Sequence, residues 1–99
     1  MAPRLDLQVL LEQLADHVYF QPPENVQMQY PCIVYKRDFA ETEHADNGSY
    51  RITLRYMVTV IDRDPDSTIV QAVALLPMCT MNRFFTADGL NHDVFTLFF

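Results

Sequence analysis

Residues 50–77 read YRITLRYMVTVIDRDPDSTIVQAVALLP, and the first half of this stretch alternates between large apolar side chains and mostly polar ones. Successive side chains of a β-strand point to opposite faces, so the alternation predicts a strand over 50–61. One face is expected to meet the core and carries Tyr50, Ile52, Leu54, Tyr56, Val58 and Val60. The other face carries Arg51, Thr53, Arg55, Met57 and Thr59. This second face is only partly polar and could cover a helix, a neighbouring strand or a partner subunit.

The period of the pattern changes at Asp64-Pro65, which has the features of a helix start. Asp64 suits the N-cap, Pro65 suits the first helical position, and Asp66 places negative charge near the positive end of the helix dipole. The apolar residues that follow have helical spacing and end at a proline: Ile69, Val70, Val73, Leu76 and Pro77. The opening stretch is therefore predicted to be a strand, a capped corner and a helix that packs back on the sheet.

The remaining elements follow from periodicity and turn residues. Residues 3–18 show the apolar stripe of an amphipathic helix, and residues 18–20 suit a short strand. Residues 31–39 are β-branched and aromatic and predict a strand. Two further strands are expected at 78–86 and 92–99, with Gly89 supplying the turn between them.

Residues 40–49, AETEHADNGS, have the composition of a hairpin connection with its turn near Asn47-Gly48. We expect this hairpin to project beyond the sheet and to dock on something, because a long polar tip is costly to order alone. The expected fold class is α+β, with a mainly antiparallel sheet of four to five strands, two helices on one face and a long projecting β-hairpin.

Composition excludes several classes of function. The chain has 99 residues, enough for a single domain over 1–99. Its formal net charge is −6 with seven Lys and Arg, which argues against binding to a phosphate backbone. Two isolated glycines cannot form a glycine-rich phosphate loop. Cys32 and Cys79 lie in apolar contexts and are expected to be reduced core thiols.

Histidines next to acids are the strongest candidates for chemistry. The segments EHAD and NHD could bring His44, Asp46, His92 and Asp93 together as a metal or hydrolytic site. Their spacing matches no metal signature, however, and loops of this composition are usually solvated. We expect no catalytic residue, no metal and no cofactor, and keep a small metal-binding or hydrolytic domain as the alternative.

Aromatic residues give a sharper signal. Consecutive Phe residues at 84–85 and 98–99 must point to opposite faces of their strands. One face can be the core of the domain, and the other needs cover from its own helices or from another chain.

The ordered segments YPCIVYKRD, YRITLRYMVTVIDRDPDS and FFTADGLNHDVFTLFF resemble the small tail-terminator or tail-completion proteins of long-tailed bacteriophages. The resemblance covers residues 5–99. It implies a structural virion protein that forms a homohexameric ring, caps the tail tube, ends its polymerisation and joins it to the head connector. The implied partners are other copies of the chain, the tail-tube protein and the connector, with DNA passing through the lumen without specific binding. The implied location is the head–tail junction, after assembly in the host cytoplasm, and a neck or head-completion protein of the same particle is an alternative.

Two sets of contact residues follow as hypotheses. The hairpin and the second strand face would meet the adjacent subunit through Glu41, Glu43, His44, Asp46, Asn47, Arg51, Arg55 and Met57. The last strand would meet the tube or connector through Phe95, Phe98 and Phe99. A third reading is an adaptor that binds a host protein by adding a strand to an open sheet edge.

Overall fold

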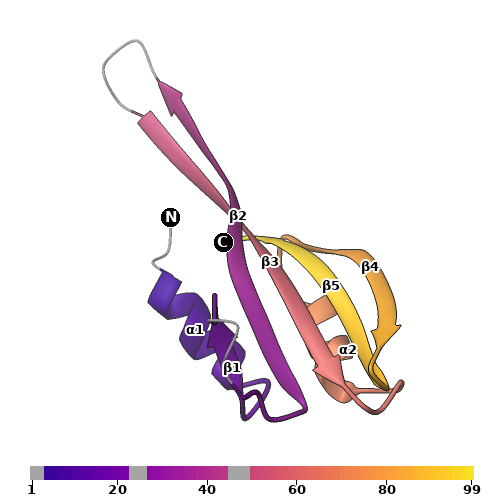
Figure 1. Cartoon of the computed structure of the whole chain (residues 1–99). Helices are drawn as coiled ribbons and strands as arrows, with labels where there is room; N and C mark the ends of the chain where they lie inside the picture. Colours follow the sequence, from indigo (N-terminus) through magenta and orange to yellow (C-terminus); the bar gives the residue numbers. More distant parts are fainter. Residues whose placement is uncertain (1–3, 23–26, 45–49) are drawn as a thin grey trace.

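The computed structural model describes residues 4–22, 27–44 and 50–99 (Figure 1). The elements in chain order are α1 (Arg4–Glu12), β1 (Val18–Phe20), β2 (Cys32–His44), β3 (Tyr50–Asp62), α2 (Thr68–Ala74), β4 (Cys79–Ala87) and β5 (Leu90–Phe98). The strands form one five-stranded sheet in the order β1-β2-β3-β5-β4. The predicted α+β class with two helices and a mainly antiparallel sheet is confirmed, and the parallel pairing of β1 with β2 makes the sheet mixed.

The core lies on one face of this sheet, which we call the covered face. The predicted alternation is confirmed for residues 55–60 of β3, since Tyr56, Val58 and Val60 are fully buried, whereas the side chains of residues 50–53 lie outside the description. Their neighbours across the sheet are Ile33 and Tyr35 of β2 and Phe95 and Leu97 of β5. Leu7 and Leu11 of α1 and Val73 of α2 complete the same cluster, so both helices pack on this face.

Polar groups of α1 also tie it to the sheet. The Tyr35 hydroxyl donates to Gln8 and accepts from Arg4, whose guanidinium lies 4.3 Å from the ring centroid of Phe20. Burial raises the pKa of the Tyr35 hydroxyl, and the hydrogen bond and charge of Arg4 oppose that shift. These contacts fix α1 over β1 and β2.

The start of α2 differs from the sequence prediction. Ser67, and not Asp64, is the N-cap, and its hydroxyl accepts a hydrogen bond from the backbone N–H of Ile69. The aspartates before it shape the corner instead: Asp62 accepts from the N–H of Asp64, and Asp64 accepts from the N–H of Asp66. The buried Ser67 satisfies a free backbone N–H at the start of α2, so Asp62 and Asp64 are not needed as caps. They form two successive side-chain turns instead.

The β2–β3 ladder extends far beyond its neighbours and forms a two-stranded arm (Figure 1). β5 pairs with β3 only as far as Arg55, and β1 pairs with β2 only at residues 33–35. Residues 41–44 and 50–53 therefore pair with each other outside the five-stranded body. The projecting hairpin is confirmed, but residues 40–44, predicted as connection, continue β2. The predicted turn at Asn47-Gly48 lies outside the described residues.

The β4–β5 connection is a tight hairpin turn, as predicted. Asp88 and Gly89 both have positive φ, 54° and 74°, which is the backbone of a type I′ turn and suits an Asp-Gly pair.

Cys32 and Cys79 are free thiols, one buried and one half-buried, and desolvation raises the pKa of Cys32 to about 11. Over the described part of the chain, every helix is too short to cross a membrane.

Candidate subunit interface

The face of the sheet opposite the helices, which we call the open face, is the candidate functional surface. Arg55, Met57 and Thr59 of β3 point to it, because they alternate with the buried residues of the covered face. The register sets Arg55 between Phe39 of β2 and Phe98 of β5. Side chains directly opposite one another on adjacent strands contact each other, so these residues form a row across the sheet.

A β-bulge at Asp38 builds this row. Arg37 pairs with Tyr56, and Phe39 pairs with the next residue, Arg55, which leaves Asp38 as the extra residue of β2. The Asp38 carboxylate accepts a hydrogen bond from Arg55 Nε at 3.0 Å. The Arg55 guanidinium carbon lies 4.8 Å from the ring centroid of Phe39. Arg55 is thus held in place by a carboxylate and an aromatic ring at the base of the arm.

The row is accessible to a partner. Phe39 is 44% exposed and Phe98 is 37% exposed. The Arg55 side chain is 35% exposed and the Asp38 side chain is 18% exposed. Because the pair is partly exposed, it contributes less than about 1 kcal/mol to stability, and its main effect is to orient the guanidinium. Two partly exposed rings flanking a fixed cation are typical of a protein contact surface, where aromatic residues and Arg are enriched.

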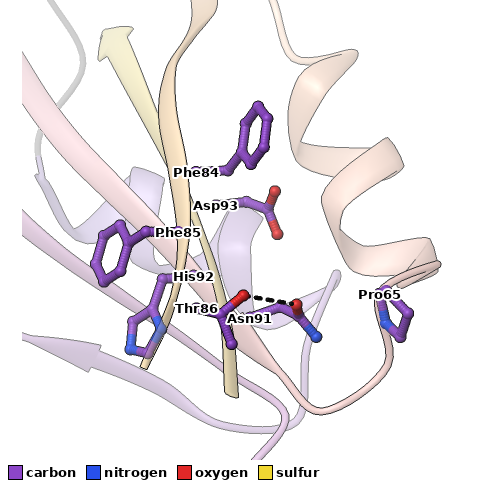
Figure 2. Close-up of a pocket in the computed structure, with 7 residues that line it drawn as sticks. All are labelled: Pro65, Phe84, Phe85, Thr86, Asn91, His92 and Asp93. Atoms are coloured by element: carbon purple, nitrogen blue, oxygen red, sulfur yellow. Dashed lines mark hydrogen bonds between the residues drawn. The ribbon is translucent and has the colours of Figure 1, made fainter. Parts of the chain in front are cut away.

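A similar arrangement lies on the open face between β4 and β5. The rings of Phe85 and His92 are stacked with their centroids 4.7 Å apart and an interplanar angle of 10° (Figure 2). The Arg83 guanidinium carbon lies 5.3 Å from the Phe85 ring centroid. Phe85 is 41% exposed, so this cluster adds a second aromatic and cationic area to the open face.

A shallow groove of about 310 Å³ lies where β4, β5 and the corner before α2 meet (Figure 2). Its lining residues are Pro65, Phe84, Phe85, Thr86, Asn91, His92 and Asp93. Asn91 fixes the corner by donating from Nδ2 to the carbonyl of Arg63 at 3.3 Å. Desolvation raises the pKa of Asp93, and the charge of His92 partly opposes this shift.

The groove does not assemble the acid–base pair that hydrolysis requires. His92 and Asp93 are consecutive in β5 and point to opposite faces, as Figure 2 shows. His44 is far from both: it pairs with Tyr50 at one end of β3, while His92 pairs with Ile61 at the other, roughly 36 Å away at the rise of a strand. Across residues 4–22, 27–40 and 54–99, whose side chains the structure describes, no three His, Cys, Asp or Glu side chains cluster as a metal site would need. The metal or hydrolytic alternative therefore has no geometric support in this part of the chain.

The predicted contact residues are distributed unevenly. Arg55 and Met57 lie on the open face, and Phe98 is exposed there. The prediction that Phe95 contacts the tube or connector is wrong, because Phe95 is fully buried in the core. Phe99 is half-buried and packs against the core.

The other predicted residues belong to the arm. Glu41, Glu43, His44 and Arg51 lie in its two paired strands, where the structure describes the backbone. Asp46 and Asn47 lie outside the described residues.

The sequence analysis did not identify Asp38, Phe39 and Arg83 as parts of the candidate contact surface, and for residues 84–85 it left open which ring needs cover. Simple alternation from buried Tyr35 would send Phe39 to the core, and the bulge reverses its direction. A second register shift between Met81 and Arg83 does the same for β4. The charged run at residues 36–38 before an aromatic residue was the available signal, since bulges interrupt regular alternation.

Comparisons with known proteins found no relative of this chain. The chain matches no protein-family model, and searches of curated proteins and of solved structures gave no match.

Proposed function

We propose that this chain is a structural protein of a long-tailed bacteriophage that forms a ring, a homohexamer, at the end of the tail tube. In this role it ends tube polymerisation and joins the tube to the head connector at the head–tail junction of the virion. The observation that carries the proposal is the row Phe39–Arg55–Phe98, exposed on the open face at the base of a projecting arm.

The open face favours association because the two helices of the chain suffice to cover only the opposite face. Both helices pack into the covered face, while Phe39, Phe85 and Phe98 remain partly exposed. Exposed aromatic side chains gathered on one surface are characteristic of interaction sites. A subunit that contributes this face to a neighbour would bury it in the assembled ring.

The arm supports the same conclusion. A two-stranded ribbon without further strands is marginally stable in water, and its outer edges present unpaired backbone N–H and C=O groups. Residues 41–44 and 50–53 form such a ribbon, and the molecule reaches 53 Å in its longest dimension. An arm of this kind gains stability by lying across a neighbouring subunit.

The charge of the chain is compatible with a DNA conduit. At −6 per copy, a ring carries a strong negative charge. Acidic groups facing the lumen would repel the phosphate backbone and let DNA pass without being held.

The decisive experiment combines electron microscopy with a polymerisation assay. The purified chain should form rings of uniform size, and adding it to polymerising tail-tube protein of the same particle should shorten the tubes and place a ring at one end. Rings that bind the connector and ignore the tube would support the neck or head-completion alternative. A chain that stays monomeric with both partners would overturn the proposal.

A further inference from the structure

The exposed surfaces of this chain differ in charge, and the difference points to how copies associate. The open face carries Lys36, Arg55 and Arg83. Arg55 is paired with Asp38, and this is the single ion pair among the side chains of residues 4–22, 27–40 and 54–99. Among the side chains described on the open face, Asp38 is also the sole acid. An acidic protein thus presents a basic and aromatic sheet face.

The outer side of α1 has the opposite character. Leu7 and Leu11 face the core, while Leu5 is 63% exposed and Val9 is 56% exposed. The neighbouring exposed side chains are acidic or uncharged: Asp6, Glu12, Gln13 and Asp16. Residues 5, 9 and 12 recur at helical spacing, so they form one stripe along the side of α1 away from the sheet.

We propose that the open face of one copy receives the outer stripe of α1 from the next copy. This inference rests on the proposed ring and specifies its contact. Leu5 and Val9 would pack among the exposed aromatic rings, while Asp6 and Glu12 would face Lys36 and Arg83. Opposite charges facing each other set partner orientation and exclude other arrangements.

The dimensions of the two surfaces agree. Nine residues of α1 span about 14 Å along the helix axis. Lys36 lies on β2 and Arg83 on β4, three strand positions apart in the sheet order. At a strand spacing of about 4.8 Å this separation is about 14 Å across the strands. Asp6 and Glu12 lie about 9 Å apart along the helix axis, and the long side chains of Lys36 and Arg83 can span the difference.

Charge also selects a head-to-tail arrangement. Two open faces in contact would oppose cations, and two α1 stripes would oppose acids. A contact between different surfaces avoids both, and such heterologous contacts close into rings when the rotation between copies permits. The charge distribution therefore favours a heterologous contact, the kind from which rings without a two-fold axis between neighbours are built.

Charge exchange between the surfaces tests the contact. Glu12→Lys and Arg83→Glu should each weaken association by at least tenfold in native mass spectrometry, because each places like charges opposite one another. An equimolar mixture of the two variants should regain rings, since the reversed helix of one variant complements the reversed sheet face of the other. Asp66→Lys is the matched control: it makes the same charge change at an exposed position outside α1 and should leave the ring intact.

The outcomes separate this contact from the proposed function. Rings formed by both single variants as readily as by the unmodified chain would overturn the α1 contact and leave the ring proposal standing. Failure of the mixture to recover rings, with circular dichroism showing both variants folded, would also overturn the contact. An unmodified chain that is monomeric at every concentration would overturn both.

Discussion

The two faces of the sheet are made by the same strands and differ in almost every other respect. On the covered face, Tyr35, Val58 and Phe95 have no exposed surface and pack against both helices. On the open face, Phe39, Phe85 and Phe98 remain more than a third exposed and lie beside arginines. The covered face supplies most of the burial that folds the chain. The open face also buries Cys32, Ile61 and Val94, but it holds aromatic area that folding leaves accessible. Stability and association should therefore respond to different residues.

The largest expected difference is between Phe95 and Phe98, three residues apart in β5. Phe95→Ala should lower the free energy of unfolding by about 3–5 kcal/mol, since it opens a cavity in the core. Phe98→Ala should lower it by less than about 1 kcal/mol while abolishing ring formation. Urea unfolding and native mass spectrometry measure the two effects. Equal destabilisation by both changes would remove the distinction between the faces.

Arg55→Glu should affect assembly far more than folding. The lost ion pair with Asp38 is partly exposed, so the fold should lose no more than about 1 kcal/mol. The reversed charge at the centre of the aromatic row should nevertheless prevent association. Asp38→Asn is the control, because it removes the ion pair and keeps the cation available; its rings should persist. Parallel loss of ring and fold in Arg55→Glu would exclude Arg55 from the interface.

Two tyrosines of the covered face test how buried hydroxyl groups affect the stability of the core. The hydroxyl of Tyr35 bonds to Gln8 and Arg4, so Tyr35→Phe should cost about 1 kcal/mol. The hydroxyl of Tyr56 is buried without a partner in the described part of the chain, so Tyr56→Phe should be neutral or stabilising by about 1 kcal/mol. Urea midpoints of the two variants give the comparison, and a clear loss of stability in Tyr56→Phe would reveal a hydroxyl contact.

The smallest expected effect is a pH dependence at Asp93. Its folded-state pKa is raised above the ordinary value of 3.8 because burial disfavours the carboxylate. The folded state therefore binds the proton more tightly, and this contribution to stability is lost as pH rises from 3.8 through the folded pKa. Asp93→Asn should be more stable than the unmodified chain at neutral pH and lose that advantage in acid. An identical pH profile for the two proteins would contradict the assignment.

Local periodicity accounts for what the sequence predicted well. The alternation in β3, the stripe of α1 and the Asp-Gly turn at Asp88-Gly89 depend on neighbours in sequence, so they could be recognised directly. The predicted end of the first helix at residue 18 was wrong, because α1 ends at Glu12. The start of α2 was misplaced because Asp64-Pro65 and Ser67 offer competing caps, and only the packing of the corner selects Ser67.

The candidate interface was harder to predict because it depends on register. Which face of β5 is buried follows from the pairing of Phe95 with Val58, and a single strand does not contain that information. Phe39 lies on the open face because of the bulge at Asp38, and the alternation of side chains does not predict where a bulge occurs. Arg55 and Met57 were found because the long strand β3 carries an unbroken pattern through the centre of the sheet.

The most direct test of the open face as a subunit contact is the mass of the unmodified chain in solution, measured beside Phe98→Ala over a range of concentrations. The unmodified chain should be a single closed oligomer of six times the protomer mass, and Phe98→Ala should be a folded monomer. A monomer for the unmodified chain at every concentration, or an undisturbed oligomer for Phe98→Ala, would contradict this role of the open face.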